Sequence, residues 1–209
     1  MIGTLNNQIT GKIRDRLHSE CITILIRAYN LAKSDPVFEK ELEEDAYTAI
    51  LVEKYMPKVP LKYEGKWFIA PQVPHYTKDH LNGTVPPSQA PKPDIRFEKY
   101  VLSHPESFKY TIEAKKVKDS SSSLKRRYIT TGIDNYLTGR YPYGCLAGYV
   151  IKCDSNKCIQ GINSLLKKGK RVTELLQNGK SIEGHTSVYY SHHINNFELR
   201  HIFLEFLKT

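Results

Sequence analysis

Apolar residues recur at helical spacing through the first part of the chain. Between residues 2 and 33 they mark one face of a long helix, formed by Ile9, Ile13, Leu17, Ile24, Leu25, Ala28 and Leu31. Asp35 and Pro36 then give a capping residue followed by a residue suited to a first helical turn. They predict a second helix from Pro36 to about Tyr55, which Pro57 ends.

Strand patterns begin after these helices. The segment Leu61–Pro71 predicts a strand, and residues 72–92 form a long proline-rich loop. Residues 93–115 read as two strands joined by a short polar loop, because apolar side chains alternate with polar ones in the second of them.

The second half of the chain alternates between helix and strand patterns. It predicts helices at 124–138 and 155–177, and strands at 145–152, 186–191 and 199–207, with His192 and His193 in a loop. This order favours an α/β fold with a mixed central sheet flanked by helices. The length of 209 residues fits one domain, 1–209, with N-terminal helices in 1–56 and a sheet core in 61–209 whose proline-rich loop spans 71–92.

The paired strands at 93–115 carry the candidate chemistry. Glu113 and Lys115 project to the same face of a strand, and Asp94 stands beside Glu113 if the two strands pair. Carboxylates and carbonyls suit Mg²⁺, with Mn²⁺ as the alternative. A nearby lysine can orient water and stabilise developing negative charge. These parts describe hydrolysis of a phosphodiester bond.

The residues Pro93-Asp94 and Glu113-Ala114-Lys115 resemble the motif of the PD-(D/E)XK, or restriction-endonuclease-like, nuclease superfamily. The resemblance implies that Asp94 and Glu113 bind the metal, that the Ala114 carbonyl is an extra ligand and that Lys115 is the catalytic lysine. The expected order of a helix, three strands, a helix and a further strand also agrees with this core. The stretch 128–151 and the late residues 191–206 look like parts of bacterial defence-associated nucleases of the same type.

The second predicted helix carries an acidic cluster near its start. Many members of the resembled superfamily place a further glutamate on a helix before the core strands. Glu43 precedes Ala46 and Ile50 by three and seven residues, so it is the first choice for this metal ligand and catalytic carboxylate, and Glu44 is the second. The attraction of acidic residues to a helix start also explains the cluster without any such role.

The chain carries 31 Lys and Arg residues against 22 Asp and Glu, a formal net charge of +9. This balance suits a polyanion partner, although basic residues also line solvated helix faces. Candidate nucleic-acid contacts follow the proposed site, namely Lys116, Lys118, Lys125, Arg126, Arg127 and Arg140. Lys167, Lys168, Lys170 and Arg171 form a second basic group.

Other classes of protein are disfavoured. No apolar run reaches membrane-spanning length and the first residues lack a signal-peptide pattern, so we expect a cytoplasmic protein without a membrane partner. The cysteines are Cys21, Cys145, Cys153 and Cys158, and their spacing with the histidines matches no standard zinc module. Thiols in a reducing compartment explain them better.

The sequence therefore predicts a Mg²⁺-dependent endonuclease that acts on nucleic acid, with DNA favoured over RNA, in a bacterial or phage defence system. Two alternatives remain open: a catalytically inactive nucleic-acid-binding or assembly subunit of the same fold, and a protein-interaction domain with a basic surface. A chain of this size has little room for a sequence-reading domain, which leaves a partner protein as one source of recognition. A double-strand cut by one site per chain would suggest a homodimer.

Overall fold

A computed structural model describes residues 2–60, 67–100, 107–141 and 144–207. Its centre is a mixed sheet of seven strands in the order β1-β2-β3-β4-β7-β6-β5. The strands are β1 (Phe68–Pro71), β2 (Ile95–Lys99), β3 (Phe108–Val117), β4 (Gly144–Ile151), β5 (Gln177–Asn178), β6 (Val188–His193) and β7 (Phe197–Leu207). The prediction of an α/β fold with a mixed sheet is confirmed.

The pairing divides the sheet into three parts. Strand β2 runs antiparallel to both of its neighbours, β1 and β3. Strands β3, β4 and β7 are parallel and form the centre. Strand β6 then runs antiparallel to β7, and the short β5 antiparallel to β6. Parallel strands are normally covered on both faces, which explains the continuous apolar run of β4.

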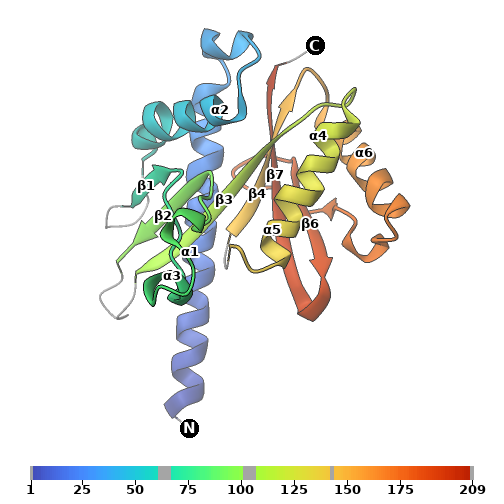
Figure 1. Ribbon diagram of the computed structural model, residues 1–209. Coiled ribbons are helices and arrows are strands. Elements are labelled where there is room, and N and C mark those ends of the chain that lie inside the picture. The colour runs from blue at the N-terminus through green and yellow to red at the C-terminus, as the bar shows by residue number, and fades with distance from the viewer. Residues whose placement is uncertain (1, 61–66, 101–106, 142–143, 208–209) are drawn as a thin grey trace.

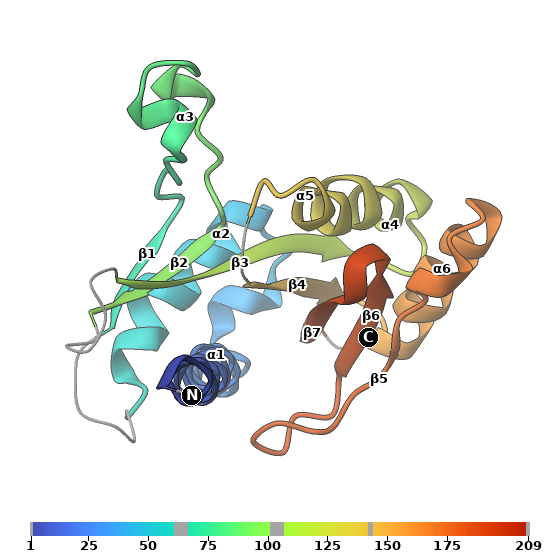
Figure 2. The same ribbon diagram turned by 90° about the horizontal axis from the view of Figure 1, so that it is seen from below.

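Helices cover both faces of this sheet. They are α1 (Ile2–Ala32), α2 (Glu44–Ile50), α3 (Lys78–Leu81), α4 (Ser122–Arg127), α5 (Asp134–Leu137) and α6 (Ser155–Lys168). Figure 2 shows α1 on one face and α4 and α5 on the other, while α3 projects away from the sheet within the proline-rich loop. Figure 1 shows the N-terminal half of α1 extending beyond the body of the fold.

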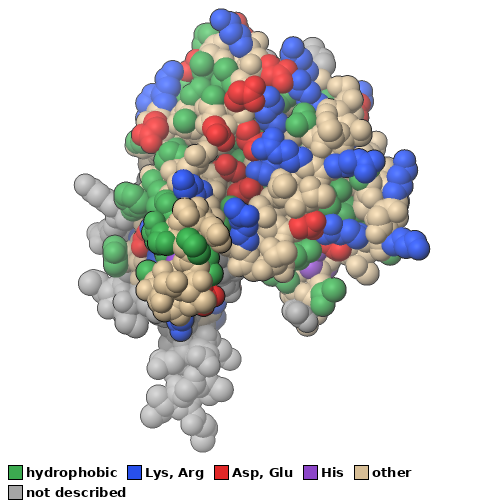
Figure 3. Space-filling model, in the orientation of Figure 1, with side chains coloured by type: hydrophobic (Ala, Val, Ile, Leu, Met, Phe, Trp, Pro, Cys, Tyr) green, Lys and Arg blue, Asp and Glu red, His purple; other side chains and the backbone are tan. Residues whose placement is uncertain are grey.

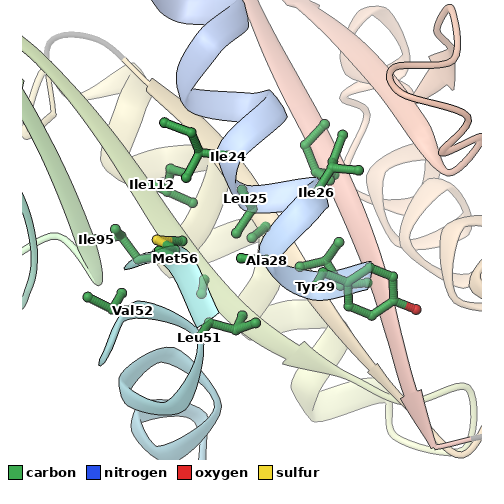
Figure 4. Close-up of a cluster of buried hydrophobic side chains, with 14 of the residues drawn as sticks. Ile24, Leu25, Ile26, Ala28, Tyr29, Leu51, Val52, Met56, Ile95 and Ile112 are labelled. Carbon is green, nitrogen blue, oxygen red and sulfur yellow. The ribbon is translucent and has the colours of Figure 1, made fainter. Parts of the chain in front are cut away.

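One core lies between α1 and the sheet. Ile22, Leu25 and Ile26 of α1 are completely buried there. They pack in one cluster with Leu51 and Met56, which follow α2, and with apolar residues of the central strands (Figure 4). The helical spacing of the apolar residues in the sequence therefore corresponds to a buried face of α1.

A second core lies on the opposite face of the sheet. Tyr128, Ile133 and Ile162 pack there against Leu146 and other residues of the strands. Leu146 and its neighbours alternate between the two cores along β4, as side chains of a strand must. Glu113 pairs with Leu146 across β3 and β4, so Glu113 faces the side covered by α4 and α5.

Several predicted elements differ from the structure. The expected helix from Pro36 to Tyr55 is broken: a 3-10 turn (Pro36–Glu39) is followed by α2 and by a π-helical turn (Leu51–Tyr55). The helix predicted to reach residue 177 ends at Lys168, before Gly169. The prediction that His192 and His193 form a loop is wrong, because both pair with β7 within β6. Residues 61–66 of the predicted strand lie outside the described residues, and β1 begins at Phe68.

Candidate acidic site

Pairing of β2 with β3 brings the two halves of the candidate motif together. Ile95 pairs with Ile112, so Asp94, one residue earlier, stands level with Glu113. The Ala114 backbone N–H donates a hydrogen bond of 2.6 Å to Asp94 Oδ2. The expected juxtaposition of Asp94 and Glu113 is therefore present, and a backbone contact fixes it.

Of the two glutamates predicted on this helix, Glu44 lies beside Lys115 and Glu43 points into solvent. Glu43 caps the start of α2, and its side chain is 93% exposed. Glu44 begins the helix and is buried, with Oε2 accepting a 2.8 Å hydrogen bond from the Lys116 N–H. The choice of Glu43 as the inward-facing residue is wrong because the chain is extended up to Glu43, so helical phase does not reach it.

Lys115 lies at the centre of the acidic residues. Its Nζ is 2.8 Å from Glu113 Oε1, 3.2 Å from Glu44 Oε1 and 3.6 Å from Asp94 Oδ2. It also donates a 2.7 Å hydrogen bond to the Ala114 carbonyl. All four charged side chains are buried. We call Glu44, Asp94, Glu113 and Lys115 the acidic site.

These contacts shift the protonation of the acidic site. Burial, followed by the charge of Glu113, raises the pKa of Asp94 from 3.8 to about 7. Burial alone lowers the pKa of Lys115, but the charges of Asp94, Glu113 and Glu44 outweigh it and raise that pKa above 10.5. Lys115 is therefore a cation and a donor of hydrogen bonds in this arrangement.

The residue types of the acidic site fit a hard divalent cation. Its donors are carboxylate oxygens and the Ala114 carbonyl, which Mg²⁺ and Mn²⁺ prefer. Glu113 Oε2 is buried and has no hydrogen-bond partner within the described residues. Across the same residues, no group of three or more His, Cys, Asp or Glu side chains is arranged to hold a metal ion. In the structure the Lys115 ammonium lies among these carboxylates, within 3.6 Å of an oxygen of each.

Two tyrosines support the acidic site from the α5 side. The buried Tyr136 hydroxyl donates to the Cys145 carbonyl at 2.8 Å and accepts from the Glu113 N–H at 3.2 Å. It thereby links the start of β4 to the backbone of Glu113 within β3. Burial and the nearby Glu113 carboxylate raise the pKa of Tyr141.

Arg127 adds a further positive charge at the edge of the acidic site. Its guanidinium lies 2.8 Å from Glu44 Oε1, and its side chain is 52% exposed. Arg127 is the last residue of α4, the helix that covers this face of the sheet. Its positive charge therefore contacts the Glu44 carboxylate of α2. The basic residue can therefore reach both Glu44 and solvent.

The other predicted nucleic-acid contacts are used in different ways. Lys116 and Lys118 pair with Glu41, at 3.3 Å and 2.6 Å. Lys125 is buried, and its ammonium donates to the Asp119 carbonyl, so the prediction that it points toward a substrate is wrong. Arg126 and Arg140 are exposed. Figure 3 shows acidic and basic side chains side by side on the face that carries α4 and α5.

Comparisons with protein-family models, with curated proteins and with solved structures find no match to this chain. None of the helices in the described part combines the length and apolar character needed to cross a membrane. The geometry of the acidic site is accordingly the main evidence about function.

Proposed function

We propose that this chain hydrolyses phosphodiester bonds of nucleic acid, DNA first, with the help of Mg²⁺ or Mn²⁺ at the acidic site. The observation that carries the proposal is the convergence of Glu44, Asp94 and Glu113 from separate elements on Lys115. Buried charges are costly unless they are paired, and a buried acid with a strongly raised pKa is a common mark of a functional site.

The fold supports the same proposal. The helix α1, the strands β1 to β3, the α4–α5 segment and then β4 follow in the order expected of a restriction-endonuclease-like core. Of the motif residues, Glu113 and Lys115 lie on β3, and Asp94 lies directly before β2. We therefore propose membership of that superfamily, with Glu44 as the helix carboxylate.

Each residue of the acidic site has a proposed task. Asp94, Glu113, Glu44 and the Ala114 carbonyl would hold the metal ion. A bound divalent ion polarises a phosphoryl oxygen and lowers the pKa of water. Lys115, as an ammonium, stabilises negative charge that develops on the phosphate oxygens. Water attacks phosphorus, the bond from phosphorus to the leaving oxygen breaks, and that oxygen takes up a proton.

The alternative is a nucleic-acid-binding or assembly subunit without catalysis. The specific observation in its favour is that Lys115 already neutralises the carboxylates, so the acidic site is satisfied without a metal ion. Such a subunit binds nucleic acid equally well in the presence of a chelator. Metal dependence of cleavage therefore separates the two functions.

The test is a cleavage assay on supercoiled plasmid, single-stranded DNA and single-stranded RNA, with Mg²⁺, Mn²⁺ or a chelator. Asp94→Asn removes a metal ligand at constant side-chain size and should abolish cleavage. Lys109→Ala is the matched control for Lys115→Ala, because Lys109 lies on the same strand but is exposed. Cleavage by Asp94→Asn at the parent rate would refute the proposal. Metal-independent binding without cleavage of any substrate would support the alternative.

A further inference from the structure

Two cysteine thiols lie together at the junction of β4 and α6, away from the acidic site. Cys153 follows the end of β4 and Cys158 lies in the first turn of α6. Their Sγ atoms are 2.8 Å apart, and both are free thiols. A disulfide bond measures about 2.05 Å, so bond formation requires only a small approach of the two sulfur atoms.

The local backbone holds the two thiols in this position. Lys152 turns the chain after β4 with a left-handed φ of 54°. Asp154 then caps α6, and its Oδ1 accepts a 2.6 Å hydrogen bond from the Asn156 N–H. The turn and the cap together direct Cys153 back toward the buried face of α6, where Cys158 lies.

The two thiols differ in access. Cys153 is half-buried, whereas Cys158 is completely buried. The remaining cysteines, Cys21 and Cys145, are both completely buried as well. An oxidant dissolved in water therefore reaches Cys153 first, and Cys158 is the thiol next to it.

We propose that Cys153 and Cys158 are a redox modification site. They form a reversible disulfide bond with each other when they react with a small disulfide such as oxidised glutathione. The Cys153 thiolate attacks the small disulfide, which forms a mixed disulfide and releases one small thiol. The Cys158 thiolate then attacks Cys153 Sγ, the mixed disulfide breaks and the second small thiol leaves. Two protein thiols are oxidised and one small disulfide is reduced to two thiols.

The surroundings set the rate of the second step and its structural consequence. Burial, followed by the neighbouring Cys153, raises the pKa of Cys158, which makes its thiolate scarcer at neutral pH. Lys125 of α4 packs against α6 near this pair, since a Cβ added at Gly161, three residues after Cys158, would lie 2.7 Å from Lys125 Nζ. The disulfide would fix the β4–α6 turn next to α4. This inference does not depend on the proposed function.

The test uses the full chain and oxidised glutathione, with acid quenching and alkylation of the remaining thiols. Trypsin cuts after Lys152 and Lys157, so Cys153 and Cys158 fall in different peptides that only a disulfide can join. We expect that linked peptide, a parent mass lower by two hydrogen atoms, and full reversal by a thiol reductant. Cys145→Ala, the control, should give the same linkage.

Two variants make the result decisive. Cys158→Ser should retain glutathione on Cys153, because the resolving thiol is missing. Cys153→Ser, at the less buried position, should give neither adduct nor linkage. A parent chain that keeps a stable glutathione adduct on Cys153, or whose two thiols are both alkylated after oxidation, would overturn the proposal.

Discussion

The Lys115 ammonium lies 3.2 Å from Glu44 Oε1, although the two residues are 71 positions apart in the chain. This ion pair connects the start of α2 to the middle of β3. Both side chains are buried, so the pair is a part of the folded structure that water screens poorly. It makes the properties of the acidic site sensitive to single substitutions.

Glu43 and Glu44 are neighbours in the chain, but the Glu43 side chain is in solvent and the Glu44 side chain is buried. Substitutions at the two positions can therefore be compared directly. On the proposed function, Glu44→Gln should reduce the rate of DNA cleavage by roughly 10- to 100-fold, since it weakens the contacts that orient Lys115 and the metal ligands. Glu43→Gln should cleave at the parent rate, because its side chain is in solvent. Single-turnover cleavage at saturating Mg²⁺ measures both, and equal rates in the two variants would exclude Glu44 from the site.

Lys115→Met should destabilise the fold strongly at neutral pH. It removes the cation from among three buried carboxylates, and loss of one partner of a buried ion pair costs about 3–5 kcal/mol. Lys118→Met is the matched control, because the Lys118–Glu41 pair is partly exposed and should contribute less than about 1 kcal/mol. Urea unfolding of the three chains gives both differences, and similar values for the two variants would contradict the central position of Lys115.

Asp94 should make stability depend on pH. Its pKa is raised from 3.8 to about 7, so the folded state binds the proton more tightly than the unfolded chain does. The contribution of Asp94 to stability is therefore fully present below the unfolded value and is lost as the pH rises toward the folded value.

Asp94→Asn should flatten this dependence, because an amide does not titrate in that range. The free energy of unfolding, measured for both chains in urea at several values between about pH 4 and pH 8, gives the slope. Parallel curves for the parent and Asp94→Asn would show that Asp94 has an ordinary pKa in the folded protein.

Arg126 should contribute to binding of nucleic acid through phosphate contacts. It is exposed on α4, and within the described residues it has no ion-pair partner. Arg126→Ala should weaken binding of duplex DNA and lower the slope of log affinity against log salt by about one. Lys168→Ala tests the second basic group on α6 in the same titration. An unchanged slope for Arg126→Ala together with a reduced slope for Lys168→Ala would contradict this prediction. It would place the nucleic-acid interface at α6 instead of α4.

The strand pair and the motif could be predicted from the sequence because they depend on local pattern. Alternation in residues 108–115 fixes which side chains share a face, and strand pairing then brings Asp94 to Glu113. The apolar run at 145–152 likewise predicted a strand, and in the structure β4 is buried in the middle of the sheet.

The choice between Glu43 and Glu44 could not be made in the same way. It depends on where α2 begins, and the chain between Glu39 and Glu44 is extended although its composition suits a helix. Tertiary contacts decide that boundary, because Glu44 is held by Lys115, by Arg127 and by the Lys116 N–H. The sequence showed the charges of Arg127 and Lys115 and offered Glu44 as the second choice, but it did not show which glutamate they contact.

The strand order has a consequence for how the protein is made. Strand β7 follows all the other strands in the chain, yet it lies inside the sheet between β4 and β6. During synthesis β4, which neighbours the strand of Lys115, lacks one partner until β7 has left the ribosome. This pairing joins strands that lie far apart in the chain, and long-range pairing of parallel strands is a slow event in folding. Until β7 is made, the apolar strand β4 presents an open edge, which favours pairing with another unfolded chain.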